Sequence, residues 1–457
     1  MPHRICMIGA GPSGLSLARA FDALTDEKLK SDYEIVLFDK QGTWGGMWNY
    51  DWRIGTDANG EPQPCSMYQH LWTNVPKEAS EPADYPFDEY FGRPVPSFLP
   101  RKVVRDWLVS RAIKHDLDKK YDFRYHTAVT DVSFDEKKEK FNVAVQQYQP
   151  DVNHYVETFD YVVVGSGHYS VPNYPKDIEG IEGFKGPILH AHDFRCPDGL
   201  TDRNVLLIGS SYSAQDIACQ LYKFGSRSVT ICYKERSSGV TWPKGIEELE
   251  MIQRFDGNTA VFKNGEQRFI NVVIFCSGYK MSYPFVEDSL QLKTENSMQK
   301  LWPGNLYKGV VWQDNPRMFY LGAQMLVFSW CFFDIQAWFI RDVITDRHTL
   351  PDLQQRREDE QKWLDRQSRL PFEVDMMVDF QADHMTDLLS ASDYPKFNVI
   401  QSANTFKDWF HSHLTGVMGV RDRCSTSSVT GTVAAKPSKC WLETFDDRIE
   451  DFERANN

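Results

Sequence analysis

The sequence predicts an α/β protein with two Rossmann-like dinucleotide-binding domains, one inserted into the other. The first observation is a Gly-rich turn at residues 9–14 (GAGPSG), which follows the apolar run 4–8. The second is a related turn at residues 209–214 (GSSYSA), which follows the apolar run 204–208. A Gly-rich turn between a strand and a helix is typical of a dinucleotide-binding βαβ unit. Two such turns indicate two dinucleotides, and so electron transfer from one cofactor to another.

Length, charge and cysteine usage narrow the class of protein. A chain of 457 residues is too long for one small core. The formal net charge of −13 argues against nucleic acid or an anionic membrane as the main partner. Nine cysteines are scattered without a Cys-x-x-Cys pair, which argues against a flavin disulfide reductase and against a zinc site. We expect a reducing, cytoplasmic location, and no signal peptide because a strand begins at once.

The first unit opens as a βαβ unit with parallel strands. Its elements are expected to be a strand at 4–9, a helix at 13–24, a charged loop at 24–32 and a strand at 34–38. An irregular stretch rich in Pro and aromatic residues follows, and then an amphipathic helix and a set of strands. These three segments are 44–100, 101–115 and 121–166.

The second unit is expected between about residues 170 and 277. It contains a second βαβ unit and closes with an apolar strand, and the chain then returns to the first unit. We therefore expect one dinucleotide-binding domain formed by 1–169 and 278–457, with a second dinucleotide-binding domain inserted at 170–277. The expected elements of the insert are strand 204–209, helix 213–224, strand 228–233 and strand 271–279, and the Ser/Thr/Gly-rich stretch 416–437 is expected to be a loop or arm.

One segment, residues 318–340, is long enough to be considered as a membrane span. It is interrupted by Gln324, Asp334 and Gln336, and a charge at mid-span is costly. We expect a buried strand followed by a buried helix instead, with no membrane partner.

The first turn has a residue type for each task of dinucleotide binding. Gly9 permits the tight turn, Gly11 lets the backbone approach the pyrophosphate, and Gly14 lets helix and strand pack closely. Backbone N–H groups at the helix N-terminus then face the anion. Asp39 ends the next predicted strand, where a carboxylate binds ribose hydroxyls.

The second turn begins with Gly209 and has Ser211 at the second Gly position, where a small side chain still admits a close backbone. The strand after it ends in Lys234 and Arg236, which suit a 2′-phosphate and favour NADPH over NADH. Glu235 between them would repel that phosphate. The alternative for this run is a solvated group of charges without a ligand.

Two further motifs lie near the turns. Residues 44–48 (WGGMW) suit the wall of a flat ligand, because the Gly pair lets the backbone pass closely; the alternative is a packed loop. His190 and His192 have an i,i+2 spacing without other clustered ligands, so we expect a structural role and no metal. The sequence contains no GxSxG or HExxH motif, which leaves a hydrolase without support.

A third motif carries a resemblance to a known family. Phe184, Gly186, His190 and Phe194 form FxGxxxHxxxF between the two turns. This arrangement resembles the class B flavin-containing monooxygenases. The segments GTWGGMWNYDWR, CSMYQHLWTNVPKE, HAHDFR, GSSYSAQDI, NLYKGVVWQDNP and FDIQAW are most similar to the bacterial trimethylamine monooxygenases within that class.

The resemblance implies a reaction. NADPH would reduce FAD, the reduced flavin would react with O₂ to give a C4a-hydroperoxyflavin, and bound NADP⁺ would shield it from water. A tertiary amine such as trimethylamine, or a sulfide, would then take one oxygen atom to give the N-oxide or S-oxide. The resemblance also implies a homodimer.

The same resemblance implies roles for individual residues. Asn74 should donate a hydrogen bond near the reactive flavin edge, although a capped loop Asn is the alternative, and Tyr212 should contact NADP⁺ there. Gln324 and Phe328 belong to the segment expected beside the flavin. Matched FAD positions are Ser13, Asp39, Gln41, Met47, Trp48 and Val129, and matched NADP positions are Trp72, Tyr212, Ser213, Lys234 and Arg421.

One departure from the group concerns the substrate pocket. Met325 and Val327 stand where close relatives carry Asp and Trp, so the sequence predicts a more apolar and more open pocket. Three alternatives remain open at this point. They are a Baeyer–Villiger monooxygenase acting on ketones, against which the Phe194 ending counts, an uncoupled NADPH oxidase, and a non-catalytic cofactor-binding protein.

Overall fold

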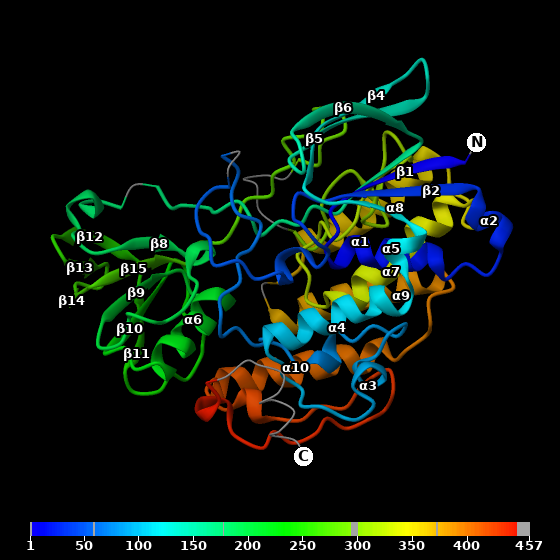
Figure 1. The fold of residues 1–457 in the computed structure, drawn as a ribbon. Helices are drawn as coiled ribbons and strands as arrows, with labels where there is room; N and C mark the ends of the chain where they lie inside the picture. The colour runs from blue at the N-terminus through cyan, green and yellow to red at the C-terminus, as the bar shows by residue number, and fades with distance from the viewer. Residues whose placement is uncertain (1, 58–59, 177, 294–299, 372, 446–457) are drawn as a thin grey trace.

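The computed structural model describes residues 2–57, 60–176, 178–293, 300–371 and 373–445. Two lobes are visible in Figure 1, the first built around a mostly parallel sheet and the second around a parallel one. The chain leaves the first lobe after strand β7 (Tyr161–Val164) and is back in it by Val286, which forms a β-bridge with Val132; it rejoins the sheet at strand β16 (Leu306–Tyr307). The predicted α/β class with two Rossmann-like folds is therefore confirmed.

The first lobe contains a seven-stranded sheet in the order β16-β17-β18-β7-β1-β2-β3. Strands β18, β7, β1, β2 and β3 are parallel to one another, β16 and β17 add antiparallel pairings at the β18 edge, and Ile5 of β1 is paired with Ile35 of β2. Because β1 lies between β2 and β7, the Gly-rich turn after β1 occupies a topological switch point, where open α/β sheets bind ligands. The remaining bounds are β1 His3–Ile8, β2 Tyr33–Phe38, β3 Asp122–Arg124, β17 Val311–Trp312 and β18 Met318–Tyr320.

Two helices from distant parts of the sequence pack against each other in this lobe. They are α1 (Pro12–Asp22) and α7 (Trp330–Ile344), and α7 is buried along nearly its whole length. Strand β18 and α7 are the buried strand and helix expected for residues 318–340, so that prediction is confirmed. Among the described residues, no helix combines the length and the apolar character that crossing a membrane requires.

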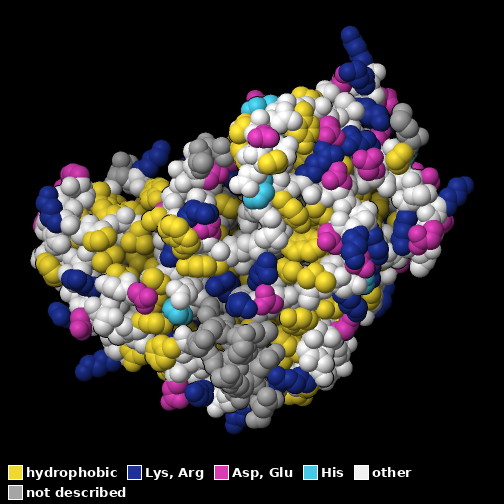
Figure 2. Space-filling model, viewed as in Figure 1, with side chains coloured by type: hydrophobic (Ala, Val, Ile, Leu, Met, Phe, Trp, Pro, Cys, Tyr) yellow, Lys and Arg dark blue, Asp and Glu magenta, His cyan; other side chains and the backbone are white. Residues whose placement is uncertain are grey.

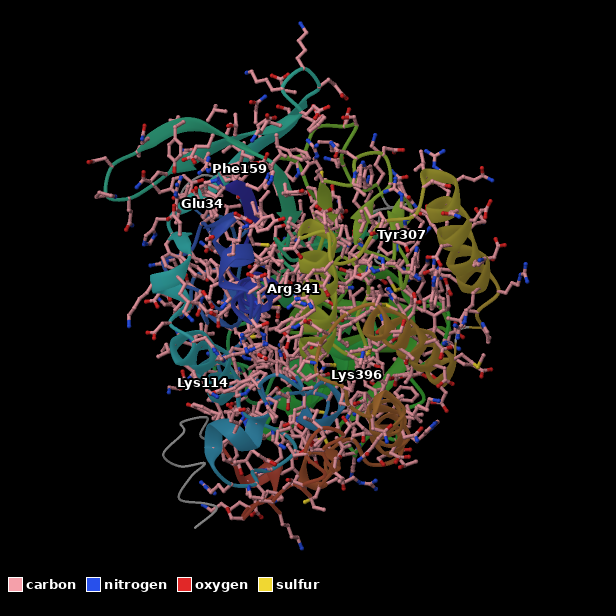
Figure 3. The ribbon with its side chains drawn as sticks, turned by 90° about the vertical axis from the view of Figure 1, so that its right-hand side faces the viewer. Glu34, Lys114, Phe159, Tyr307, Arg341 and Lys396 are labelled. Carbon is pink, nitrogen blue, oxygen red and sulfur yellow. The ribbon has the colours of Figure 1, made fainter. Side chains whose placement is uncertain are left out.

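The polar residues that interrupt α7 have buried partners. Asp334 accepts two hydrogen bonds of 2.8 Å from Arg111 and one of 2.6 Å from the Ser16 hydroxyl. Arg341, labelled near the centre of Figure 3, donates to Asp342 at 2.7 Å and to the Ala20 carbonyl at 3.0 Å. These pairs fasten α7 to neighbouring segments, because a buried charge without a partner would be strongly unfavourable.

The second lobe contains a five-stranded sheet, all parallel, in the order β11-β10-β9-β15-β8. Strand β9 lies between β10 and β15, so the second Gly-rich turn also occupies a switch point. Helix α6 (Tyr212–Lys223) follows that turn and packs on the sheet. The bounds are β8 Ile188–His190, β9 Asn204–Ile208, β10 Ser228–Tyr233, β11 Ile246–Glu250 and β15 Val272–Phe275, with a small antiparallel sheet of β12 Ile252–Asp256, β13 Thr259–Phe262 and β14 Gln267–Phe269.

The remaining elements cover the first lobe and reach toward the second. An antiparallel sheet of β4, β5 and β6 lies at one end of the first lobe, and α10 extends along its base toward α6 (Figure 1). Charged side chains of both signs are interspersed on the face shown in Figure 2. The bounds are α4 Arg101–Lys114, α5 Leu117–Lys120, β4 Thr127–Asp135, β5 Lys140–Gln147, β6 Asn153–Phe159, α8 Leu353–Ser368, α9 Val374–Ser390 and α10 Val399–Gly416.

Two expected elements differ from the structure. The charged stretch 24–32 is not only a loop, because it contains the helix α2 (Glu27–Ser31). The Asp26 carboxylate caps this helix by accepting from the N–H groups of Lys28 and Leu29, a signal available in the sequence. The apolar strand expected at 271–279 ends at Phe275. In the described part of the irregular stretch 44–100, the regular elements are the short helices η1 Gly46–Trp48, η2 Lys77–Ala79 and α3 Phe87–Phe91.

Candidate functional site

The first Gly-rich turn, residues 9–14, presents backbone atoms with few side chains, and we call it the cradle. Gly9 has φ of 104°, and an added Cβ would lie 2.6 Å from the Gly165 carbonyl oxygen of the strand end beside it. A Cβ on Gly14 would collide with the Gly9 carbonyl oxygen. Helix α1 begins directly after Gly11 without a side-chain cap, so its first N–H groups face outward from the turn. This arrangement fits an anionic dinucleotide.

Asp39 lies beside this turn at the end of β2. Its carboxylate accepts a 2.7 Å hydrogen bond from the Ala10 N–H and a 2.8 Å bond from the Gln41 N–H. Burial raises the pKa of this carboxyl group, and the two N–H donors oppose that shift. The side chain is thereby oriented next to the cradle, and its remaining lone pairs are suited to ribose hydroxyls.

The Gly pair of the WGGMW segment lets a second stretch of backbone lie against the cradle. A Cβ on Gly46 would lie 2.8 Å from the Gly11 Cα, so glycine is required on steric grounds here. The Gln41 side chain donates to the Gly46 carbonyl at 3.2 Å. Met47 follows, and the Trp48 ring packs against Trp330 at 5.7 Å between centroids.

The segment after β18 reaches the same cradle. A Cβ on Gly322 would lie 3.2 Å from the Ser13 hydroxyl oxygen of α1. The Gln324 side chain is fully buried, where it donates to the Gly309 carbonyl and accepts a 2.9 Å bond from Gln336. Both ends of this amide are therefore used within the protein. The structure thus places Ser13 at the cradle and Gln324 just behind it.

Two further residues expected at FAD lie in packed surroundings. Phe328 is fully buried and contacts Phe406 of α10 at 6.0 Å between ring centroids. Val129 lies on β4 beside a register shift in its pairing with β5. Neither environment shows by itself a surface prepared for a ligand.

The second turn repeats the geometry of the first. Gly209 has φ of 115°, and an added Cβ would collide with the Cys276 carbonyl oxygen. Ser211, Tyr212 and Ser213 are exposed at the start of α6, and no side chain caps this helix. The uncapped N–H groups fit the pyrophosphate of a second dinucleotide.

The basic residues after β10 are open to solvent. Lys234 is exposed, and its ammonium group lies 4.0 Å from the Glu235 carboxylate, itself exposed. Arg236 is exposed as well. An exposed ion pair at this distance is weak, so Lys234 remains able to bind a phosphate.

Asn74 and Tyr212 lie in the region where the lobes meet. Asn74 is exposed, and its amide makes no hydrogen bond to the described residues. The preceding residues are fixed: Trp72 is buried, and Thr73 exchanges two hydrogen bonds with Leu99, of 2.9 and 3.1 Å. A free amide on a fixed loop is suited to donate to a ligand.

Arg421 has protein partners that the sequence did not predict. It is buried, forms an ion pair with Asp216 of α6 and donates to the Thr73 carbonyl at 3.3 Å. Its guanidinium group also lies 4.6 Å from the Trp441 ring centroid. Asp216 follows Tyr212 by one helical turn on α6, so the 3.6-residue period was the signal that could have indicated its orientation.

The expected pocket residues belong to a short segment held by α9. The Gln381 side chain donates to the Met325 carbonyl and accepts a 2.7 Å bond from the Val327 N–H. Met325 packs against the cluster formed by Trp302 and Phe380. The segment is therefore fixed in place, which gives its two apolar side chains defined positions.

His190 of the FxGxxxHxxxF motif and the neighbouring His192 lie where the chain passes from the first lobe to the second. His190 is fully buried, and its Nδ1 accepts a 3.0 Å bond from the His192 N–H. The His192 ring contacts the Gln63 carbonyl and the Asp193 carboxylate, both at 2.8 Å. Among the described residues, no three His, Cys, Asp or Glu side chains are grouped as a metal site.

Comparison with known proteins gives consistent matches over the chain. The model of the family described as flavin-binding monooxygenase-like matches residues 2–240 and 245–390. A trimethylamine monooxygenase from Methylocella silvestris is 44% identical over 450 residues, covering 98% of each chain. Another from a Pelagibacter species is 42% identical and covers 98% of this chain and 99% of its own.

Solved structures agree with this result. The crystal structure of Tmm from a Pelagibacter strain has a TM-score of 0.92 at 42% identity, and covers 98% of this chain and all of the other. An S-allyl-L-cysteine S-oxygenase from Allium sativum has a TM-score of 0.78 at 23% identity, covering 93% and 95%, and shares the fold. The chain therefore belongs to the flavin-binding monooxygenase-like family and is an oxidoreductase that uses FAD and NADPH.

Proposed function

We propose that this protein uses NADPH and O₂ to oxygenate the nitrogen of small tertiary amines, with trimethylamine as the first candidate substrate. The observation that carries this proposal is the similarity to proteins named trimethylamine monooxygenase, at 40–44% identity over at least 98% of the chain. Both switch points with bare Gly-rich turns support two dinucleotides in one chain, as such a reaction requires.

We assign the first lobe to FAD and the second to NADPH, with domain limits of 1–169 and 278–457 for FAD and 170–277 for NADPH. The first cradle, Asp39 and the Gly46 approach support the FAD assignment. Exposed Lys234 and Arg236 support binding of the NADPH 2′-phosphate. Further proposed cofactor contacts are Gly9, Gly11, Ser13, Gly14, Gln41, Met47, Trp48, Trp72, Val129, Gly209, Ser211, Ser213, Gln324, Phe328 and Arg421.

Bound FAD, once reduced by NADPH, supplies the activation of O₂. We propose that Asn74 donates a hydrogen bond to the reacting groups, because its amide is exposed and free on a fixed loop. A neutral amide stabilises negative charge without transferring a proton. Tyr212 is proposed to hold the nicotinamide dinucleotide from the start of α6, with its ring packed at 5.9 Å from Trp409.

The segment with Met325 and Val327 favours a second class of substrate. Both side chains are apolar and lack the charge and aromatic ring that would attract a small ammonium ion. Sulfides and larger, less polar amines are therefore proposed as additional substrates.

We further propose that the protein is a homodimer in the cytoplasm. Light scattering of the purified protein measures its molecular mass in solution and so tests the dimer.

The test is rapid mixing of the NADPH-reduced protein with O₂ in the presence and absence of trimethylamine, followed by product identification. We expect amine-dependent return of oxidised flavin together with stoichiometric trimethylamine N-oxide. If sulfides respond but the amine does not, the S-oxygenase assignment replaces the first one. Product from ketones, or peroxide release without any substrate dependence, would overturn the proposal.

A further inference from the structure

One face of helix α6 connects the NADPH lobe to the loop that carries Asn74. Tyr212, Asp216, Gln220 and Lys223 recur at intervals of three and four residues and so share one side of the helix. Tyr212 begins this stripe at the proposed cofactor site. We call the other three residues the α6 seam.

The seam holds the Asn74 loop at two points. The Gln220 side chain donates a 2.9 Å hydrogen bond to the His70 carbonyl. Asp216 forms an ion pair with Arg421, whose Nε donates to the Thr73 carbonyl at 3.3 Å. Gln220 is fully buried and Asp216 nearly so, which makes these contacts stronger than surface ones.

The other end of the seam receives the C-terminal segment. Lys223 donates to the carbonyls of Trp441, at 2.6 Å, and Thr444. Its ammonium group lies 4.3 Å from the Trp441 ring centroid, and the same ring contacts Arg421. Trp441 is buried, and both cations lie against its ring. The C-terminal segment therefore joins the seam to the Arg421 contact with Thr73.

The opposite side of the loop belongs to the FAD lobe, because Thr73 is bonded twice to Leu99. The position of Asn74 is thus set by both lobes at once. We propose that the α6 seam is a positioning device: it places the Asn74 loop according to where the NADPH lobe sits. Gln220, Asp216 and Lys223 then determine what fraction of the NADPH consumed yields oxygenated substrate rather than hydrogen peroxide. This inference rests on the proposed function.

The test uses the FAD-loaded full-length protein and the variants Gln220→Met and Lys223→Met. Each removes the donors but keeps a flexible side chain of similar length. Lys263→Met on the exposed hairpin of the same lobe is the matched control. The measurements are FAD content, melting temperature, and peroxide released per NADPH consumed with saturating trimethylamine.

We expect both variants to retain FAD and to release on the order of tenfold more peroxide per NADPH than the parent, since small displacements of a positioned group cost large factors in rate. Lys223→Arg, which can still donate to both carbonyls, should restore most of the coupling. A peroxide fraction equal to that of the Lys263→Met control in folded, FAD-loaded variants would overturn the proposal. If Lys223→Met does not fold, the peroxide fraction of Gln220→Met alone decides whether the proposal holds.

A second measurement tests the α6 seam even if the proposed oxygenation is wrong. If the parent oxygenates no amine or sulfide, the same variants are compared in anaerobic reduction of FAD by NADPH. Slower reduction in the seam variants at saturating NADPH, with the control unchanged, would support the seam. Equal rates in all variants would overturn it.

Discussion

Asn74 is the residue on which the proposed oxygenation depends most directly. Its amide has no partner among the described residues, while its neighbour Thr73 is held by Leu99 and by Arg421, which is paired with Asp216 of the second lobe. A side chain that is free at its tip and anchored at its base is prepared for a ligand and contributes little to folding. Removing it should therefore affect catalysis and leave stability unchanged.

The first prediction is that Asn74→Ala retains FAD and its melting temperature but forms product about a hundredfold more slowly, because one preorganised donor is lost. Product formation and FAD content are measured on the same sample. Asn264→Ala, on an exposed turn of the other lobe, is the control. Near-normal N-oxide formation in Asn74→Ala would remove this residue from the mechanism.

The second prediction concerns Lys234. Its exposed ammonium group has only a weak pair with Glu235, so a 2′-phosphate should gain a charge-assisted hydrogen bond. Lys234→Ser should lower kcat/KM for NADPH by about tenfold and leave that for NADH nearly unchanged. Glu235→Gln should raise the preference for NADPH. Equal kcat/KM for the two coenzymes in the parent would show that Glu235 cancels the basic pair.

At the scale of elements, helix α7 shows how a buried segment tolerates charges. Asp334 joins α7 to α4 through Arg111 and to α1 through Ser16, and Tyr394 donates to the same carboxylate at 3.1 Å. Arg111 has Asp84 as a second partner at 2.7 Å. The network thus connects α7, α4 and α1 with the segments that carry Asp84 and Tyr394.

The third prediction is that Asp334→Ala lowers the free energy of unfolding by about 3–5 kcal/mol, because it leaves a buried guanidinium group short of its partner. Urea unfolding followed by fluorescence measures this change. Asp379→Ala breaks the partly exposed ion pair with Lys407 and should cost at most about 1 kcal/mol. Similar losses in the two variants would contradict a dominant role of the buried network.

At the scale of the whole molecule, buried neutral histidines determine part of the response to acid. Burial lowers the pKa of His168, His190, His384 and His413 from 6.5 to about 4. Between these values the unfolded chain binds more protons than the folded one. Stability should therefore be intact above pH 6.5 and decrease as the pH falls toward 4.

The fourth prediction isolates one of these rings. His168→Phe should flatten the decrease in urea midpoint between pH 6.5 and 4.5, because a group that cannot take up a proton contributes no pH dependence. His154→Phe, at an exposed position on β6, should keep the slope of the parent. An unchanged slope in His168→Phe would show that its burial has no such effect.

The α/β class, the two βαβ units and the family could all be predicted from the order of residues along the chain. Strand and helix periods and the spacing of the Gly-rich turns at 9–14 and 209–214 are local properties that can be read along the chain. The buried strand and helix at 318–340 also followed, because Asp334 excluded a membrane span. The short helix α2 was missed although Asp26 provided a capping signal.

The contacts between distant residues could not be predicted in this way and became known from the folded chain. The Asp216–Arg421 pair joins positions 205 residues apart, and the Gln220 contact with His70 spans 150. The sequence assigned Arg421 to NADP by resemblance alone, and the structure adds its protein partners. Contacts of this kind depend on how two lobes and a C-terminal segment pack together, and no local period along the chain records that arrangement.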